Sequence, residues 1–378
     1  MKAALAFLPL AACAAVHAQS SVTLYGAVDA AVTYTSNQHG AATYQASSGG
    51  RAGDKFGLTG TEMLSPNLKA RFVLESGFNI QNGTEQPANT LFGRQAYVGL
   101  SGTWGEVLLG RQYSLTNNYL SPLGSDTLFA GGLGSMLSDV DAVWNYDKVS
   151  NAIKFNSADV RGWRYSAMYS RSSSSSDLET HDGYSIGSSY TKGNLTIAAA
   201  YMNMSTPATT MYLASEPPVA GQPYALPVAN PIFDNYTTAN TQQVFGVGAS
   251  YVSGRSQLTA VYTNVRFQDI VRTLSNANAP TNAVFNNYQL NYAFKFTPYT
   301  MAGVGYQYSV APHSEYQLVD FGAAYYFSKA TYVYWITAWQ HASGTNSTGK
   351  PAVADMLALA PSSDSDQLTV RVGLRHLF

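Results

Sequence analysis

The residues able to do chemistry in this sequence are scattered, and they form no catalytic or metal-binding motif. There are six histidines, and one of them, His17, falls in an apolar N-terminal segment. A hydrolase needs a nucleophile, a histidine and an orienting group in one site, yet no serine motif accompanies these histidines. Neither a His-x-x-x-His pair nor a carboxylate-rich loop stands out. The sequence therefore argues against an enzyme and against any bound metal or other cofactor.

Charged side chains remain as the functional candidates, and two of them share one face of an alternating segment. In LKARFVLESGFNI, Arg71 and Glu75 lie opposite an apolar row that begins at Leu68. Side chains in a strand alternate between the two faces of the sheet. Arg71 and Glu75 therefore face the same side of the sheet. Because that side carries the polar residues, it is the side expected to face water.

A second group of charges lies in the long stretch 113–147, where Gly131 and Gly132 permit a tight fold. Its acidic residues are Asp126, Asp139 and Asp141. This stretch is either an ordinary surface loop or a loop that folds inward and presents negative charge. The residues alone leave both interpretations open.

The elements that position these charges are strands, because period-two alternation recurs along the whole chain. VTLYGAVDAAVTY, VDFGAAYYFS and the final SDQLTVRVGLRHLF all alternate in this way, and no segment keeps a helical period. Glycine recurs inside strands, as at Gly246 with Gly248 and Gly303 with Gly305, as expected where a curved sheet bends. No apolar run after the N-terminal segment approaches the roughly 20 residues of a membrane helix.

Composition limits the class of protein. Charged residues are 11% of the chain, well below a soluble protein's share, whereas there are 27 tyrosines and 32 glycines. The net charge of −1 offers no basic surface for nucleic acid. These values indicate either a secreted all-β protein or a transmembrane β-barrel, and alternation alone does not separate the two.

Connection lengths favour the barrel. Seven tight turns are predicted at 64–67, 101–104, 158–162, 191–194, 253–256, 295–298 and 328–330. Eight longer connections are predicted near 37–52, 81–91, 113–147, 171–183, 203–242, 267–283, 310–315 and 342–366. Their alternation predicts a transmembrane antiparallel β-barrel of 16 strands with short turns at one end and long loops at the other, as in bacterial outer membranes. An open edge is not tolerated in lipid, so the strand ending at Phe378 should pair with the one starting near Val22.

The N-terminus reads as a cleaved signal peptide at residues 1–18, because Lys2 precedes a short apolar run and small residues. Cleavage after Ala18 would leave residues 19–378 as a single domain without cysteine. An alternative is lipoprotein processing at Cys13, which lies in the motif LAAC.

Several motifs resemble the trimeric Gram-negative porins, particularly the betaproteobacterial general porins. They are, in order along the chain, QSSVTLYGAVDAAVTY, KFGLTGTE, LKARFVLESGFN, FGRQAYVGLSGTWGEVLLGRQYS and VGLRHLF. The resemblance covers nearly the whole chain and is strongest for residues 19–112 and the last strand. It implies a homotrimer in the outer membrane, a long third loop folded into the lumen as a constriction, and a last strand, ending at Phe378, that the outer-membrane assembly machinery recognises.

The resemblance also implies a cluster of basic residues on the wall opposite the third loop. By motif these are Lys55, Arg94 and Lys148, although the family usually has arginine at the first and third positions. Lysine keeps the charge but lacks the planar guanidinium that stacks on its neighbours. Arg71, Glu75 and Asp126 are expected to join this pore constriction. The alternative is that these charges merely solvate the lumen.

The expected function is a water-filled channel for passive diffusion of small hydrophilic solutes and ions, weakly selective, with anions favoured. The surrounding partners would be outer-membrane lipid and lipopolysaccharide. Two other functions stay open: a solute-specific porin for organic acids or sugars, and an adhesin or structural anchor. Arg111, in GRQYS, fits the lumen wall, a subunit contact or a neighbour's loop equally well.

Overall fold

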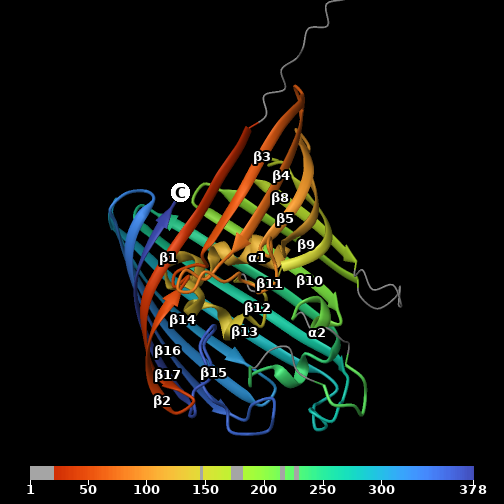
Figure 1. Cartoon of the computed structure of the whole chain (residues 1–378), viewed down its shortest axis with the longest axis vertical. Coiled ribbons are helices and arrows are strands. Elements are labelled where there is room, and N and C mark those ends of the chain that lie inside the picture. Colours follow the sequence, from red (N-terminus) through yellow and green to blue (C-terminus); the bar gives the residue numbers. More distant parts are fainter. Residues whose placement is uncertain (1–20, 145–147, 172–181, 213–217, 225–229) are drawn as a thin grey trace, which may run out of the picture.

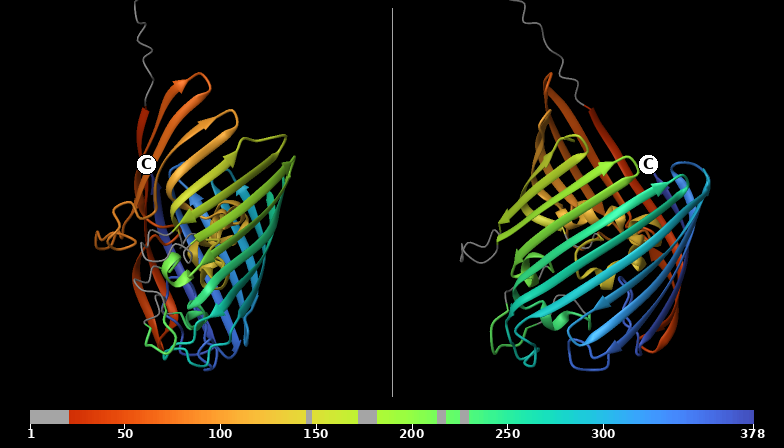
Figure 2. Two further views of the ribbon diagram at one scale, coloured as in Figure 1. Left: turned by 90° about the vertical axis from the view of Figure 1, so that its right-hand side faces the viewer. Right: turned by 180° about the vertical axis from the view of Figure 1, so that it is seen from behind.

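A computed structural model describes residues 21–144, 148–171, 182–212, 218–224 and 230–378. Within these residues seventeen strands form one antiparallel sheet that closes on itself (Figures 1 and 2). The predicted cleavage site after Ala18, the alternative at Cys13 and most of the connection near 171–183 lie outside the described residues. No helix in the described part of the chain has the length and apolar character to cross a bilayer.

The strands follow one another around the barrel in chain order. They are β1 (Ser21–Gln38), β2 (Ala41–Ser48), β3 (Lys55–Ser65), β4 (Leu68–Gly77), β5 (Gln95–Gly102), β6 (Gly105–Tyr113), β7 (Lys148–Ser157), β8 (Trp163–Arg171), β9 (Asp182–Lys192), β10 (Leu195–Ser205), β11 (Ala239–Ser253), β12 (Ser256–Ile270), β13 (Ala283–Thr297), β14 (Thr300–Val310), β15 (Ser314–Tyr326), β16 (Thr331–Gly344) and β17 (Asp366–Leu377).

The predicted connection near 37–52 is wrong, because half of it is strand β2. β2 pairs with the second half of β1, whereas β3 pairs with the first half. The two strands therefore share one position in the wall and are separated by residues 49–54. Counted this way the barrel has the predicted 16 strands. The strand was missed because AATYQASS is short and consists mostly of small and polar residues, so its alternation is weak and it resembles a loop.

All seven predicted tight turns connect the strands as expected, and they gather at one end of the barrel, at the top of Figure 1. The longer connections gather at the other end. This arrangement is typical of outer-membrane barrels, whose short turns face the periplasm and whose long loops face outside.

The exposure of the side chains shows which face of each strand lies outside the barrel and which lies inside. In β1, Val32 is 64% exposed on the outer surface while its neighbours Ala31 and Thr33 are buried inside. In β17, Leu374 is 51% exposed and Arg375 is buried. The apolar parity thus faces outward to lipid and the polar parity faces the lumen, which is the pattern of a membrane barrel.

The barrel closes where β17 meets β1, in a register that runs from Ala27 opposite Leu377 to Thr35 opposite Thr369. Beyond it the backbones of Gly26 and Phe378 exchange two hydrogen bonds, of 2.9 and 3.1 Å. A Cβ at residue 26 would lie only 2.3 Å from the Phe378 ring. This close contact therefore requires glycine, which has no Cβ. The predicted pairing of the last strand is confirmed.

An apolar core lies inside the barrel near its long-loop end. Phe267 and Phe285 point inward from β12 and β13, with ring centroids 6.0 Å apart. Tyr236, in the short 3-10 helix η5 (Asp234–Tyr236), covers both rings at 6.3 and 5.8 Å. The long connection between β10 and β11, which also contains α2 (Pro207–Thr210), therefore folds into the mouth and narrows it.

Candidate pore constriction

The inner loop, residues 114–144, lies inside the barrel. It contains five short helices, α1 (Leu115–Leu120), η1 (Ser121–Leu123), η2 (Asp126–Ala130), η3 (Gly131–Gly134) and η4 (Met136–Asp139). α1 packs on β8 to β11, and η2 packs on β14 to β16. The loop therefore covers that half of the inner wall, and its other side faces the half formed by β1 to β7 (Figure 1). Of the two interpretations of this stretch, the inward fold is the one the structure adopts.

Side chains of the wall hold the inner loop through its backbone and one serine. Ser125 donates a hydrogen bond of 2.8 Å from Oγ to Oδ2 of Asp320 on β15. Gln307 on β14 donates from Nε2 to the carbonyl oxygen of Gly134 at 2.7 Å. These polar contacts are buried, and breaking one would leave an unpaired polar group inside the protein.

Glycines in the wall receive the apolar side chains of the inner loop. A Cβ at Gly303 would lie 2.2 Å from the Phe129 ring, and one at Gly322 would lie 2.2 Å from the Phe129 carbonyl oxygen. A Cβ at Gly246 would lie 2.3 Å from Leu120. No side chain fits at such distances, so these glycines form a groove for the loop. Contact with the inner loop therefore explains these glycines more specifically than the curvature of the sheet does.

Lys55, Glu75 and Arg94 meet on the wall that faces the inner loop. The Glu75 carboxylate is 1% exposed and accepts from Lys55 Nζ at 3.0 Å and from Arg94 Nε at 2.9 Å. Tyr25 OH and Tyr113 OH also donate to it, at 2.9 and 3.3 Å. One carboxylate therefore organises two cations, and its burial is compensated by four donors.

The third predicted cation joins this group through an aromatic ring. Lys148, the first residue of β7, places its ammonium 5.4 Å from the centre of the Tyr113 ring, a cation–π distance. Tyr113 in turn accepts from Arg94 Nη2 at 3.0 Å. Lys55, Glu75, Arg94 and Lys148, here called the wall cluster, thus lie together although the sequence separates them widely.

Arg71 lies apart from the wall cluster. It is four residues before Glu75 on β4, which corresponds to about 13 Å along a strand, and it pairs with Glu106 at 2.6 Å. Arg111 ties the wall itself, donating to the Gly93 carbonyl at 2.7 Å and to Ser150 Oγ at 2.6 Å. Of the residues expected at the constriction, Arg71 therefore pairs elsewhere on the wall and not with Glu75.

The acidic residues of the inner loop are buried in it. Asp126 is 2% exposed, and its carboxylate accepts from the backbone N–H of Thr127 at 2.6 Å. Burial raises the pKa of Asp126 well above its usual value, and the nearby Asp139 and Asp141 raise it further. Burial and Asp139 likewise raise the pKa of Asp141 to about 7, although Thr263 donates to it at 2.7 Å. The Asp126 carboxylate therefore lies within the loop, and not on its lumen surface.

Arg51 connects the wall to the inner loop and was missed by the sequence analysis. Its two terminal nitrogens donate to the carbonyl oxygens of Asp126 and Thr127, at 2.6 and 2.8 Å. Arg51 belongs to residues 49–54, where the chain leaves the sheet between β2 and β3. Its signal was hidden because that segment was predicted to be part of a surface loop.

The inner side of the barrel seam carries a second group of charges. Arg375 on β17 pairs with Asp29 on β1 at 3.0 Å, and Asp29 also accepts from the backbone N–H of Arg51 at 2.9 Å. Arg371 donates to the Gly50 carbonyl at 2.7 Å. This ion pair was predictable from the sequence, because Asp29 and Arg375 lie on the lumen face of two strands that were predicted to pair. The group anchors residues 49–54, and so Arg51, to the wall.

Among the described residues, no three histidine, cysteine or acidic side chains come together as metal ligands. The arrangement is one of fixed cations, a buried carboxylate and tyrosines beside an aqueous space. Such groups bias the passage of ions and small polar solutes.

Comparisons with known proteins agree with this architecture. A family model described as Gram-negative porin matches residues 3–345. An outer membrane porin protein of Bordetella pertussis is 31% identical over 214 residues, which are 50% of this chain and 55% of that protein. Outer membrane porin protein 32 of Delftia acidovorans is 39% identical over 137 residues, or 36% of this chain and 38% of that protein. The matched segments thus span about half or less of the relatives' lengths.

Solved structures share the fold at low sequence identity. The anion-selective porin from Comamonas acidovorans superposes with a TM-score of 0.73 at 21% identity, covering 95% of this chain and all of that one. OmpT of Vibrio cholerae superposes with a TM-score of 0.64 at 16% identity, covering 95% and 98%. With a closed barrel, an apolar outer surface and a family match over most of its length, this chain belongs to the Gram-negative porins and is an integral protein of the bacterial outer membrane.

Proposed function

We propose that the protein forms a water-filled channel for passive diffusion of small hydrophilic solutes and ions, and that the channel weakly favours anions. The observation that carries this proposal is the wall cluster facing the inner loop across the lumen. A barrel of this size leaves an aqueous interior, and the loop and the cluster narrow it from opposite sides. This arrangement supports a channel rather than an enzyme.

The sign of the selectivity follows from the balance of charge at this level. Lys55 and Arg94 pair with Glu75, and Lys148 lies beside them on the Tyr113 ring, so the four charged side chains that define the wall cluster sum to a positive charge. The Asp126 carboxylate is buried within the inner loop and does not face the lumen, so it offsets this potential little. Unit charges about 4 Å apart interact by about 1 kcal/mol in water, which is enough to bias ions severalfold but too little to retain them. The Comamonas relative is called anion-selective.

We further propose a homotrimer built from chains cleaved after Ala18. One of the similar solved structures is a trimer form of OmpT. In Figure 2 the connection between β4 and β5 stands away from the barrel wall, where it is available to a neighbouring subunit. Phe378 is proposed to serve the assembly machinery, because its ring and backbone complete the seam at Gly26.

Recording from the purified protein in a planar bilayer tests this function. Conductance steps in groups of three, with a reversal potential that favours chloride over potassium in a salt gradient, would support it. A channel blocked by micromolar organic acid or sugar would instead support a solute-specific porin. Correctly folded trimer that gives no conductance would refute a channel and favour an adhesin or anchor.

A further inference from the structure

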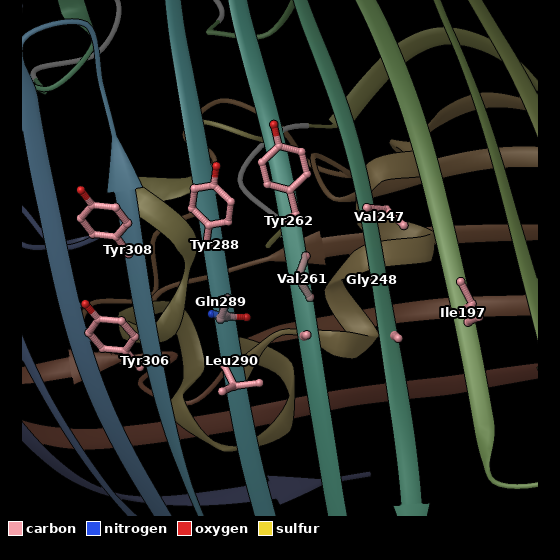
Figure 3. Close-up of a pocket in the computed structure, with 12 residues that line it drawn as sticks. Ile197, Val247, Gly248, Val261, Tyr262, Tyr288, Gln289, Leu290, Tyr306 and Tyr308 are labelled. Atoms are coloured by element: carbon pink, nitrogen blue, oxygen red, sulfur yellow. The ribbon is translucent and has the colours of Figure 1, made fainter.

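A row of three residues crosses neighbouring strands of the wall behind the inner loop. Asn291 on β13 is paired in register with Gly305 on β14, and Gly305 is paired with Asp320 on β15. All three lie on the lumen parity, and the side chains of Asn291 and Asp320 are at most 1% exposed. Figure 3 shows these strands from the lipid side, with the inner loop behind β13 at Gln289. The row is therefore enclosed between the wall and the inner loop.

The glycine lets the side chains on either side of it approach each other. A Cβ at residue 305 would lie 2.7 Å from Oδ1 of Asn291, and 2.7 and 3.0 Å from Oδ1 and Oδ2 of Asp320. Three oxygens thus lie within 3.0 Å of one point. The amide nitrogen of Asn291 donates elsewhere, to the Thr259 hydroxyl at 3.0 Å and the Leu123 carbonyl at 3.2 Å. The amide oxygen is therefore the atom that faces the glycine.

These oxygens lack the donors that buried oxygens need. Within the described residues, Oδ1 of Asn291 and Oδ1 of Asp320 accept no hydrogen bond. The same is true of Oε1 of Gln307, whose amide nitrogen lies 3.3 Å from Oδ2 of Asp320. No lysine, arginine or histidine in the described part of the chain pairs with Asp320. Buried charges in proteins are paired or coordinate metals, so a positive charge belongs between these oxygens.

We propose that the row formed by Asn291, Gly305 and Asp320 binds a small monovalent metal cation of the sodium class. A carboxylate and a neutral amide oxygen are ligands that hard cations prefer. One carboxylate balances one positive charge. Calcium sites in proteins gather roughly six to eight oxygens, often from several carboxylates, and this row offers a single acidic side chain.

The proposed cation stabilises the packing of the inner loop, because its ligands also hold that loop. Asp320 accepts from Ser125 Oγ through Oδ2 at 2.8 Å, and Asn291 donates to the Leu123 carbonyl. A cation between Asn291 and Asp320 removes the repulsion between their oxygens and keeps both side chains in place. The site lies between the loop and the wall, so it does not depend on the ion selectivity of the channel.

Anomalous diffraction from crystals of the protein, with thallium(I) acetate in place of the sodium salt, tests the proposal. Thallium(I) substitutes for small monovalent cations, so a peak is expected between Asn291 and Asp320. Asp320→Asn should abolish the peak, because the amide keeps an oxygen for Ser125 but removes the charge. Gly305→Ala should also abolish it, because the methyl group would occupy the point at which the oxygens converge. Glu315→Gln removes the same charge from an exposed position on β15, and as the matched control it should keep the peak.

A second measurement needs no crystals. A ligand that binds only the folded state raises its stability. The melting temperature in detergent should therefore fall when N-methyl-D-glucamine, which is too large for the site, replaces sodium at equal ionic strength. Asp320→Asn should show no such fall, whereas Glu315→Gln should behave like the unaltered protein.

Three results would overturn the proposal. Absence of a thallium peak from well-diffracting crystals of the unaltered protein would show that water, or a proton on Asp320, separates the oxygens. A peak from strontium but none from thallium would show a divalent site. A peak that survives in both Asp320→Asn and Gly305→Ala would show that the ion lies elsewhere. Bilayer conductance tests the channel separately: protein that binds thallium but does not conduct would refute the channel and leave the cation site intact.

Discussion

Replacing Glu75 with glutamine separates the charge of the wall cluster from its shape. The amide has nearly the same size as the carboxylate, and it keeps an oxygen that can accept from Tyr25 or Lys55. The three cations remain, so the net charge of the cluster rises from +2 to +3. The expected result is a stronger preference for anions.

The size of the effect follows from Coulomb's law. For an ion passing at about 5 Å, one unit charge contributes about 0.8 kcal/mol in water. Screening in 0.1 M salt, where the Debye length is about 10 Å, reduces this to about 0.5 kcal/mol. The change favours anions and disfavours cations equally, so the permeability ratio should rise roughly fivefold. In 1 M salt the Debye length is about 3 Å and the rise should fall below about twofold.

Reversal potentials of the reconstituted trimer, measured in KCl gradients at low and high mean salt, provide the assay. Glu106→Gln is the matched control: it removes the same charge from the Arg71 pair, about 13 Å away along the wall. It should shift the reversal potential much less, because the wall cluster is the part that faces the inner loop.

Two outcomes would refute the reasoning. If Glu75→Gln folds into trimers and leaves the reversal potential unchanged, the wall cluster does not control selectivity. If Glu75→Gln and Glu106→Gln shift it equally, the total charge of the lumen matters and the position of the cluster does not.

The remaining predictions concern the other parts of the pore. Arg94→Ala removes one of the three cations, so the reversal potential should shift toward cations. Gly303→Val would drive a methyl group into the Phe129 ring, 2.2 Å from the Cβ position; overpacking of this kind costs about 1–3 kcal/mol, and the dislodged inner loop should give noisier channels of altered conductance. The folded protein keeps a proton on Asp141 up to about pH 7, whereas the unfolded chain releases it near the usual value of 3.8. Packing of the inner loop should therefore weaken as the pH rises through 7, with more open-channel noise, and Asp141→Asn should remove this dependence. Deleting Phe378 should lower the amount of heat-modifiable trimer several-fold, and normal amounts would exclude a role in assembly.

The wall of the barrel was predictable because it is determined by patterns between residues close together in the sequence. Alternation identifies the face of each strand, and turn length identifies the end of the barrel, without knowledge of distant residues. The error at β2 has the same origin, since its short run of mostly small and polar residues carries only a weak period-two signal. Pairing of the first and last strands followed from the cost of an open edge in lipid.

The candidate site was predictable only in part, because its geometry depends on how separate strands come together. The lumen parity of Arg71 and Glu75 was correct, yet parity does not say that Glu75 joins Lys55 and Arg94 while Arg71 pairs with Glu106. Arg51 was invisible for a different reason. It lies where the chain leaves the sheet, so no periodic pattern describes it.

The position of the inner loop nevertheless has a signal in the sequence, carried by the wall and not by the loop. Gly246, Gly303 and Gly322 all lie on the lumen parity of their strands, and each meets an inner-loop atom at a distance that no Cβ tolerates. A glycine that merely relieved curvature would have open space at its Cβ position. The glycines at lumen positions on β11, β14 and β15 that meet inner-loop atoms therefore mark the part of the wall against which the loop packs.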